Sequence, residues 1–440
     1  MQLSEHFTYK KLFKYSFPSI AMMIFTSIYG VVDGFFISNF VGTREFTAVN
    51  FILPVVMILG AIGFVFGTGG AALIGKTLGE NNNERANEIF SLLIYTSIVA
   101  GAFLTVVGIF MIKPVASFLG AEGQLLKNSI IYGSVYSLGV CGSILQFEFQ
   151  CLMPTAQKPK LGLYVTIAAG MTNIILDALF VAVFKWGLIG AAAATAVSQW
   201  VGGIIPLIYF SNENDSLLKL TKTRFDIKVL IQTCFNGLSE LLSNIATSIV
   251  GILFNMQLLK YAGENGVAAY GVMMYVSFIF VAIYWGYTVG TSPIISYNFG
   301  AQNFEELKSL RRKNTTVIVM LSIAMFTMAV LFARPVSAIF VKNDYRLLEM
   351  TIDGFSIFSF SFLFSGLAIF GSSFFTALND GFVSALLAIL RSFVFQIGAV
   401  LILPLMFDLD GIWLSVVVSD ALSMTAAIIF IMLKKKKYKY

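Results

Sequence analysis

Four polar residues in the first half of the chain are of the types that bind a cation or a proton inside a membrane. Asp33 is the sole charged residue between Lys14 and Arg44, and Asn173 and Asp177 share another apolar stretch. Being four residues apart, Asn173 and Asp177 lie on one face of a helix. A carboxylate deep in a bilayer costs at least about 2.5–3.5 kcal/mol, which a proton or Na⁺ removes. The alternative is that each side chain only hydrogen-bonds a neighbouring helix.

The positions of these residues along their apolar stretches predict a common depth. Asp33 lies nine residues before Gly42, and Asp177 lies eight before Lys185, where the stretches end. Thr195 lies eight residues into the following stretch. At about 1.5 Å per residue, all three lie roughly 12 Å below the outer surface. Two carboxylates there repel each other, so at least one should hold a proton near neutral pH. We therefore expect one site for H⁺ or Na⁺, built from Asp33, Asn173, Asp177 and Thr195.

A second group of residues is suited to contact an organic substrate. Glu240 lies near the middle of its own apolar stretch and is a candidate substrate group or secondary proton site. Glu148, Arg391 and Asp420 are further intramembrane charges whose role the sequence leaves open. Aromatic and methionine side chains form adaptable walls for flat organic cations, although they equally fill cores and lipid-facing positions. The candidates for such a chamber are Tyr29, Phe36, Tyr136, Phe147, Met274 and Tyr275.

The scarcity of other reactive side chains argues against an enzyme. His6, near the N-terminus, is the single histidine, which excludes His-based catalysis and His-ligated metals. The three cysteines lie in apolar stretches without metal-ligand or disulfide spacing. No nucleotide-binding motif is present, so we expect an ion gradient to supply energy. We expect no cofactor, no nucleic-acid partner, and no metal beyond Na⁺ at the four-residue site.

The elements that must position these residues are transmembrane helices. The chain of 440 residues is 58% hydrophobic and only 12% charged, whereas a soluble domain carries about 25% charged residues. A spanning helix needs about 20 mostly apolar residues. The sequence predicts an all-α membrane protein with twelve such helices, at 13–40, 47–74, 89–112, 128–153, 161–184, 187–210, 228–259, 268–298, 315–333, 347–378, 382–405 and 411–433.

The distribution of basic residues predicts the orientation in the membrane. An even number of spans puts both termini on one side, and most lysines and arginines between the spans fall on that side. Because positive charge accumulates on the cytoplasmic side, both termini should be cytoplasmic. The lysines of 434–439 then face anionic lipid headgroups. We expect a multi-pass protein of the bacterial inner membrane.

The two halves of the chain repeat at one offset of 221 residues. Gly79 falls on Gly300, and Pro114 on Pro335, without gaps. Each repeat holds six helices, so the halves share one orientation and are related by an axis along the membrane normal. We therefore predict an N-lobe at 1–210, a cytoplasmic linker at 211–227 and a C-lobe at 228–440, which rock against each other.

The four-residue site is confined to the first half. Asp33 corresponds to Phe254, and Asp177 to Gly398. Asn173 and Thr195 likewise correspond to valines. Residues that repeat serve the shared fold, whereas polar residues present in one half only are better candidates for function.

Several motifs resemble multidrug and toxic compound extrusion (MATE) transporters, over essentially the whole chain. They are Pro18–Ser19–Ile20, then 32–36 around Asp33, then 173–177 followed by 190–195. The match is with the bacterial branch of DinF-type and MepA-type proteins. The resemblance implies a parallel-repeat fold and export of cationic, amphipathic drugs in antiport with H⁺ or Na⁺. It also implies that Pro18 lets the first helix bend. One departure is the stretch 150–156, where many members carry a basic residue and a glycine.

The sequence leaves a second function open, a flippase-like exporter of a lipid-linked or other amphipathic metabolite. A cavity for pyrophosphate should be strongly cationic, whereas the only basic residue within a predicted helix interior is Arg391. We therefore favour small organic cations as substrates of a monomeric transporter. The sequence does not choose between H⁺ and Na⁺.

Overall fold

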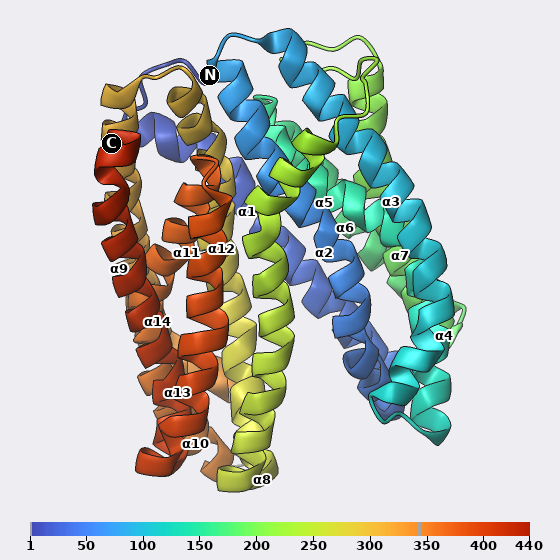
Figure 1. Cartoon of the computed structure of the whole chain (residues 1–440). Helices are drawn as coiled ribbons and strands as arrows, with labels where there is room; N and C mark the ends of the chain where they lie inside the picture. The colour runs from blue at the N-terminus through green and yellow to red at the C-terminus, as the bar shows by residue number, and fades with distance from the viewer. Residues whose placement is uncertain (1, 341–344) are drawn as a thin grey trace.

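The computed structural model describes residues 2–340 and 345–440, and the described part is helical without strands. Two helical bundles lie side by side (Figure 1). The first, here called the N-lobe, contains α1 (Tyr9–Phe36), α2 (Thr43–Gly79), α3 (Asn83–Phe118), α4 (Gly123–Ser137), α5 (Val140–Thr155), α6 (Pro159–Asp177) and α7 (Gly187–Ser211). The second, the C-lobe, contains α8 (Ile227–Gly300), α9 (Phe304–Phe340), α10 (Tyr345–Phe358), α11 (Ser361–Ala377), α12 (Gly381–Ile389), α13 (Ile397–Ile402) and α14 (Pro404–Tyr438).

The helices are long and apolar enough to cross a membrane, as predicted. Ten segments of the described chain pass this test individually. α8 provides two of them, one on each side of a sharp bend at Gly263. Two bent pairs add one span each: α4 with α5, at 56°, and α10 with α11, at 47°. The total reaches twelve spans, in agreement with the predicted fold class.

The predicted helices are too short at their polar ends. The run predicted at 315–333 lies within α9, which begins at Phe304. Asn82 and Asn303 start α3 and α9 in the same way, since each side chain accepts a hydrogen bond from the backbone N–H three residues later. Hydropathy detects only the lipid-facing part of a helix, so it misses such polar first turns.

Three short π-helical segments interrupt the α-helices next to intramembrane charges. They are η1 (Ile37–Val41), η2 (Ala178–Val183) and η3 (Leu390–Gln396). η1 begins four residues after Asp33, η2 begins directly after Asp177, and η3 contains Arg391. π-Helical turns widen a helix locally and are frequent at functional sites.

Both termini lie at one end of the molecule, where the two lobes meet, and the lobes diverge toward the other end (Figure 1). At the closed end, α2 packs directly on α8. A Cβ atom on Gly79 would overlap the carbonyl oxygen of Tyr297, and one on Gly300 would overlap that of Lys76. These two glycines are the pair aligned by the internal repeat, and they let the helix backbones touch.

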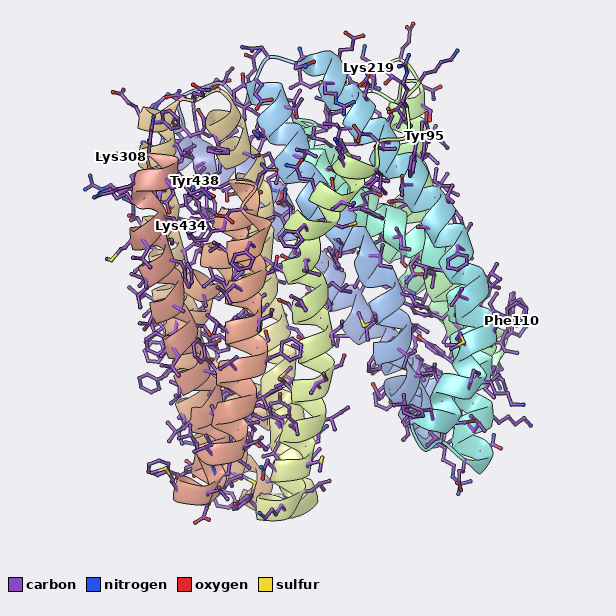
Figure 2. The ribbon with its side chains drawn as sticks, viewed as in Figure 1. Tyr95, Phe110, Lys219, Lys308, Lys434 and Tyr438 are labelled. Atoms are coloured by element: carbon purple, nitrogen blue, oxygen red, sulfur yellow. The ribbon has the colours of Figure 1, made fainter. Side chains whose placement is uncertain are left out.

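The outer surface has the polarity that a membrane requires. Phe103, Phe110 and Phe118 project from α3 with 66%, 76% and 89% of their surface exposed. Such exposure of large apolar side chains suits lipid rather than water. Lys219, Lys308 and Lys434 instead gather toward the end that holds the termini (Figure 2). The chain is therefore a multi-pass membrane protein.

Candidate functional site

The N-lobe brings together three of the four residues predicted to bind an ion. Asp33 lies near the end of α1, Asn173 in α6 and Thr195 in α7. The hydroxyl of Thr195 is 3.4 Å from Asp33 Oδ1, and Asn173 Nδ2 is 3.5 Å from the same hydroxyl. Thr195 can also donate to the carbonyl oxygen of Ala191, at 3.1 Å. This arrangement links three helices through one hydroxyl group.

Asp177, the fourth residue, completes the cluster beside Asp33. Its side chain is fully buried and lies close enough to Asp33 for an electrostatic interaction. Neither carboxylate oxygen of Asp177 has a hydrogen-bond donor among the described residues, and the same holds for Asn173 Oδ1. Buried polar atoms are normally paired. The unpaired oxygens therefore offer acceptors that suit a proton or a hard cation such as Na⁺.

Two tyrosines of α4 border this cluster. Tyr132, which the sequence interpretation missed, is fully buried, and its hydroxyl lies beside Thr195. It interacts electrostatically with both Asp33 and Asp177. Tyr136, a predicted chamber residue, is also buried and accepts a hydrogen bond of 2.8 Å from Gln199 Nε2. The four-residue spacing of the two tyrosines is the signal that would have placed them on one face.

A row of polar side chains continues along α1 from this cluster. The hydroxyl oxygen of Tyr29, another predicted chamber residue, lies 3.4 Å from Gln146 Nε2. One turn earlier, Thr26 Oγ1 is 3.5 Å from Gln150 Nε2. Thr26, Tyr29 and Asp33 are spaced by three and four residues, so they form one face of α1. Two glutamines of α5 thus hold that face against the N-lobe interior.

A cavity of about 320 Å³ lies between the lobes. It is lined by α1 and α2 of the N-lobe, and by α8, α11 and η3 of the C-lobe. Glu240 and Arg391 bring opposite charges to its wall. Most of the other lining groups are hydroxyl-bearing or aromatic, and they include Thr26, Ser27, Phe64, Phe278, Trp285, Ser372 and Ser373.

Glu240 belongs to a polar stripe on α8 that the sequence interpretation overlooked. Ser243, Asn244 and Thr247 follow it at intervals of three, four and seven residues and line the same cavity. Asn244 Nδ2 donates to the backbone carbonyl of Glu240 at 2.8 Å. Polar residues at helical spacing within an apolar segment are a readable signal of a buried or pore-lining face.

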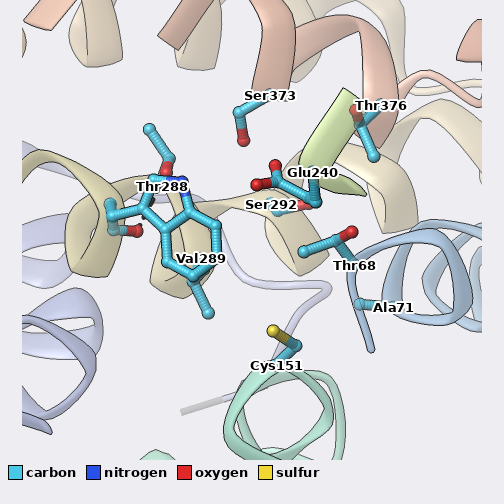
Figure 3. A pocket seen from close by; sticks show the side chains of 10 residues that line it. Thr68, Ala71, Cys151, Glu240, Thr288, Val289, Ser292, Ser373 and Thr376 are labelled. Atoms are coloured by element: carbon cyan, nitrogen blue, oxygen red, sulfur yellow. Dashed lines mark hydrogen bonds between the residues drawn. The ribbon is translucent and has the colours of Figure 1, made fainter. Parts of the chain in front are cut away.

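The carboxylate of Glu240 points into a second, narrower pocket toward the closed end. Figure 3 shows it pointing toward Ser373, with Ser292, Thr68 and Cys151 also lining this pocket. Thr288 and Thr376 add further hydroxyl groups to the lining. Glu240 therefore lies where both cavities meet, surrounded by hydrogen-bonding groups from both lobes.

An aromatic stack crosses from the N-lobe to the C-lobe beside the central cavity. Phe147 of α5 stacks on Phe64 of α2, with ring centres 4.3 Å apart. Phe64 in turn meets Trp285 of α8 edge-on, at 4.7 Å. Phe64 and Trp285 line the cavity, whereas Phe147, the residue predicted from sequence, supports them from behind.

Two other predicted chamber residues, Phe36 and Met274, do not line this cavity, and neither do Tyr29 and Tyr136. Phe36 stacks on Phe40 of η1, with ring centres 5.7 Å apart. Met274 is half-buried on the second part of α8 and does not line the cavity. The side chain of Tyr275 lies outside the described residues. Pro18 lies within α1, which continues as a helix on both sides of it, so its role in bending stays a prediction.

Comparison with known proteins identifies a common family pattern in both lobes. The model of the MatE family matches residues 18–179 and residues 241–402. One matched segment lies in each lobe, in agreement with the internal repeat.

Individual relatives match across the whole chain. The multidrug export protein MepA of Staphylococcus saprophyticus is 25% identical over 431 residues, covering 98% of this chain and 94% of that protein. A solved outward-facing multidrug resistance MATE transporter of the MOP superfamily superposes with a TM-score of 0.92 at 21% identity, covering 99% and 97% of the two chains. A MOP superfamily transporter from Pyrococcus furiosus, described as having a binding pocket of reversed polarity that suggests a different function, gives 0.92 at 21%, covering 99% and 98%.

Proposed function

The chain belongs to the MatE family, whose members are transporters rather than enzymes, and we propose that it exports amphipathic organic cations in exchange for H⁺ or Na⁺. The observation that carries the proposal is the buried cluster of Asp33, Asn173, Asp177 and Thr195, with its unpaired oxygens. Relatives named multidrug export proteins support transport out of the cell. No cofactor, nucleic acid or second subunit is needed for this activity.

The N-lobe cluster acts as the coupling site. Two carboxylates that interact in a low-dielectric interior repel each other, so binding of H⁺ or Na⁺ relieves an unfavourable interaction. Because Asp33 is on α1 and Asp177 is on α6, neutralisation changes how these helices pack. Pro18, which removes one helix hydrogen bond, is where α1 bends in response.

The central cavity is where the substrate binds. Glu240 provides a carboxylate for a cationic group, and Phe64 and Trp285 provide aromatic faces for cation–π and apolar contacts. Thr26 lines this cavity and also belongs to the polar face of α1 that carries Asp33. Repacking of α1 therefore alters the cavity wall, so that ion entry disfavours the bound drug and drives its release.

The orientation of the molecule gives this exchange its direction. With both termini in the cytoplasm of a bacterium, the lobes diverge toward the outside. In that state the N-lobe site takes its ion from outside while the drug leaves. Return to a state open toward the cytoplasm requires the lobes to rock against each other.

A lipid-linked anion is the competing substrate class. Arg391 lines the central cavity, which is the one feature that favours an anionic group. Glu240 lines the same cavity, and a carboxylate repels a pyrophosphate. A structural neighbour described as having a binding pocket of reversed polarity indicates that the fold alone does not fix the polarity of the pocket.

Efflux from reconstituted vesicles tests the proposal. The full-length chain is inserted into liposomes loaded with ethidium, and a pH gradient or a Na⁺ gradient is imposed separately. We expect ethidium transport to accelerate under at least one gradient and to collapse when an ionophore dissipates it. Transport that ignores both gradients, or that is confined to anionic amphipaths, would contradict the proposal.

A further inference from the structure

The N-terminal segment that precedes α1 crosses to the other lobe. His6 Nδ1 lies 2.6 Å from Glu306 Oε2 of α9, and the backbone N–H of Phe7 donates to Glu306 Oε1 at 3.0 Å. Lys313 Nζ, two turns along α9, donates to the carbonyl oxygen of Phe7 at 2.5 Å. Leu3 and Phe7 are fully buried. The segment is thus a packed part of the fold that joins α1 of the N-lobe to α9 of the C-lobe.

The segment that precedes α8 makes the reverse crossing. Asp226 caps α8 by accepting hydrogen bonds from the backbone N–H groups of Lys228 and Val229, at 3.1 and 3.3 Å. The same carboxylate lies 2.6 Å from Arg85 Nη2 of α3. Upstream, the backbone N–H of Thr221 donates to Ser91 of α3 at 2.8 Å. One carboxylate thus joins the start of a C-lobe helix to an N-lobe helix.

The two crossings occupy equivalent positions of the internal repeat. Arg85 and Glu306 are 221 residues apart, the offset at which the two halves align. Each follows a capping asparagine, Asn82 or Asn303, by three residues. The equivalent residues carry opposite charges, so an acid before α8 meets a base on α3, whereas a histidine before α1 meets an acid on α9. Both halves therefore keep a polar contact between the lobes at this position, although the residues that form it differ. This indicates that the contact between the lobes matters more than the identity of its residues.

Both crossings lie at the end where the lobes meet. Gly79 and Gly300, which bring α2 and α8 into backbone contact, are the last residues of these helices and lie just before α3 and α9 in sequence. Any opening at this end separates α3 from the start of α8 and α9 from the start of α1. Each crossing therefore lengthens or breaks when the lobes part there.

We propose that these contacts are two clasps, His6–Glu306 and Arg85–Asp226, that hold the lobes together at the end carrying the termini. Glu306 and Asp226 are then positioning residues for transport, because they set the balance between the closed and the open form of that end. The proposal rests on the proposed function only in assuming that the lobes alternate; it makes no reference to the substrate or the coupling ion.

Distances between spin labels at the closed end test the clasps directly. Glu84 and Glu305, which are exposed and equivalent in the repeat, are replaced by labelled cysteines in a Cys234→Ser background; Cys141 and Cys151 are buried. We expect Glu306→Gln and Asp226→Asn each to raise the population at longer distances by about threefold or more, and the double variant to raise it further. The measurement uses the purified full-length chain without drug.

The matched control is an ion pair of the same length that stays outside the clasps. Lys158 Nζ lies 2.6 Å from Asp215 Oδ2 at the same end of the molecule, between the start of α6 and the linker. Asp215→Asn should leave the distance distribution unchanged. Should Glu306→Gln or Asp226→Asn fail to fold, His6→Ala or Arg85→Gln breaks the same clasp from its other side.

An unchanged distance distribution in both clasp variants, single and combined, would overturn the proposal. So would an equal shift in Asp215→Asn, because any lost charge would then have the same effect. Since neither outcome depends on efflux, failure of the clasps is distinguishable from failure of the proposed transport activity.

Discussion

At the scale of single residues, the two aspartates of the N-lobe differ in how their charges are compensated. Asp33 accepts a hydrogen bond from Thr195, whereas neither oxygen of Asp177 has a hydrogen-bond donor among the described residues, and Asp177 faces Asp33 instead. An unpaired buried carboxylate is far more costly than an unpaired carboxylic acid. Of the two, Asp177 is therefore the residue whose folded environment most requires a bound proton or cation.

Neutral replacements of these aspartates test the coupling role. Asp33→Asn and Asp177→Asn mimic permanent protonation, so we expect drug binding to persist while gradient-driven ethidium efflux falls at least about tenfold. Asp353→Asn is the control, since it removes an exposed carboxylate of α10. Efflux and equilibrium binding are measured at matched protein levels. Wild-type efflux in both variants would leave the N-lobe without a coupling role and shift it to Glu240.

The clasp residue Asp226 gives a second prediction, on pH. The hydrogen bond and charge of Arg85 hold the pKa of the Asp226 carboxyl below its usual value, assisted by the backbone N–H groups at the start of α8. A lowered folded-state pKa contributes stability above the unfolded value, about 3.9, and loses it only as the pH falls through the folded value. The contribution of Asp226 should therefore be constant from about pH 8 to about pH 5.

Thermal unfolding checks this pH dependence. The difference in melting temperature between the wild type and Asp226→Asn should be the same at both ends of that range and shrink only at more acidic pH. Comparing the two proteins at each pH cancels the titration of all other groups. A difference that already vanishes near pH 5 would mean that Arg85 does not stabilise the ionised carboxylate.

Functional residues were predictable where a polar side chain stands alone in an apolar stretch of sequence. Asp33, Asp177 and Thr195 interrupt apolar stretches, and counting residues predicted one depth for them; the structure brings Thr195 within 3.4 Å of Asp33. Phe64 and Trp285 were not predictable, because nothing in a chain with 43 phenylalanines marks the ones that line a cavity. Their selection depends on which helix faces meet across the lobes, and hydropathy does not report this.

At the scale of helices, the contact of α2 with α8 depends on glycines at the closed end. Gly79→Ala or Gly300→Ala puts a methyl group against a backbone carbonyl of the opposite helix, which cannot move without shifting the helix. We expect each to destabilise the closed form by about 1–3 kcal/mol, as overpacking does. The distance between labels at Glu84 and Glu305 should increase.

Another pair of equivalent glycines provides the control for this helix prediction. Gly30 and Gly251 also align in the repeat, but a Cβ atom at either has no neighbour within 4 Å. Their alanine variants should leave the distance unchanged and be neutral or slightly stabilising, because alanine favours helix by up to about 1 kcal/mol. Equal effects of all four substitutions would mean that helix propensity, not the lobe contact, is responsible.

Helix existence was predictable from hydropathy, whereas helix ends and breaks were not. The bend of α8 at Gly263 requires a positive φ of 64°, and the π-helical segments add residues without changing composition. The start of α9 at Phe304 follows from the capping oxygen of Asn303, a signal independent of hydropathy. Such features depend on local backbone geometry rather than on the amount of apolar surface.

At the scale of the whole molecule, the repeat predicted two lobes of transmembrane helices, and the two-lobe fold agrees. The sequence did not predict which end of the lobes is closed. A transporter must populate both forms with one sequence, so the free-energy difference between them is small. Periodicity and hydropathy describe what both forms share, and a difference of a few contacts at the clasps and at Gly79 and Gly300 selects between them.

The orientation of the closed end in the membrane is the last prediction, and the direction of transport depends on it. Asp215 is 81% exposed at the end that holds the termini, and the excess of basic residues there should keep it in the cytoplasm. In a Cys234→Ser background, Asp215→Cys should react with an impermeant maleimide only after the cells are opened. Lys185, exposed between η2 and α7, should as cysteine react in intact cells. The reverse pattern would make the divergent lobes face the cytoplasm, so this structure would be the state that takes up drug and releases the ion, not the state that releases drug to the outside.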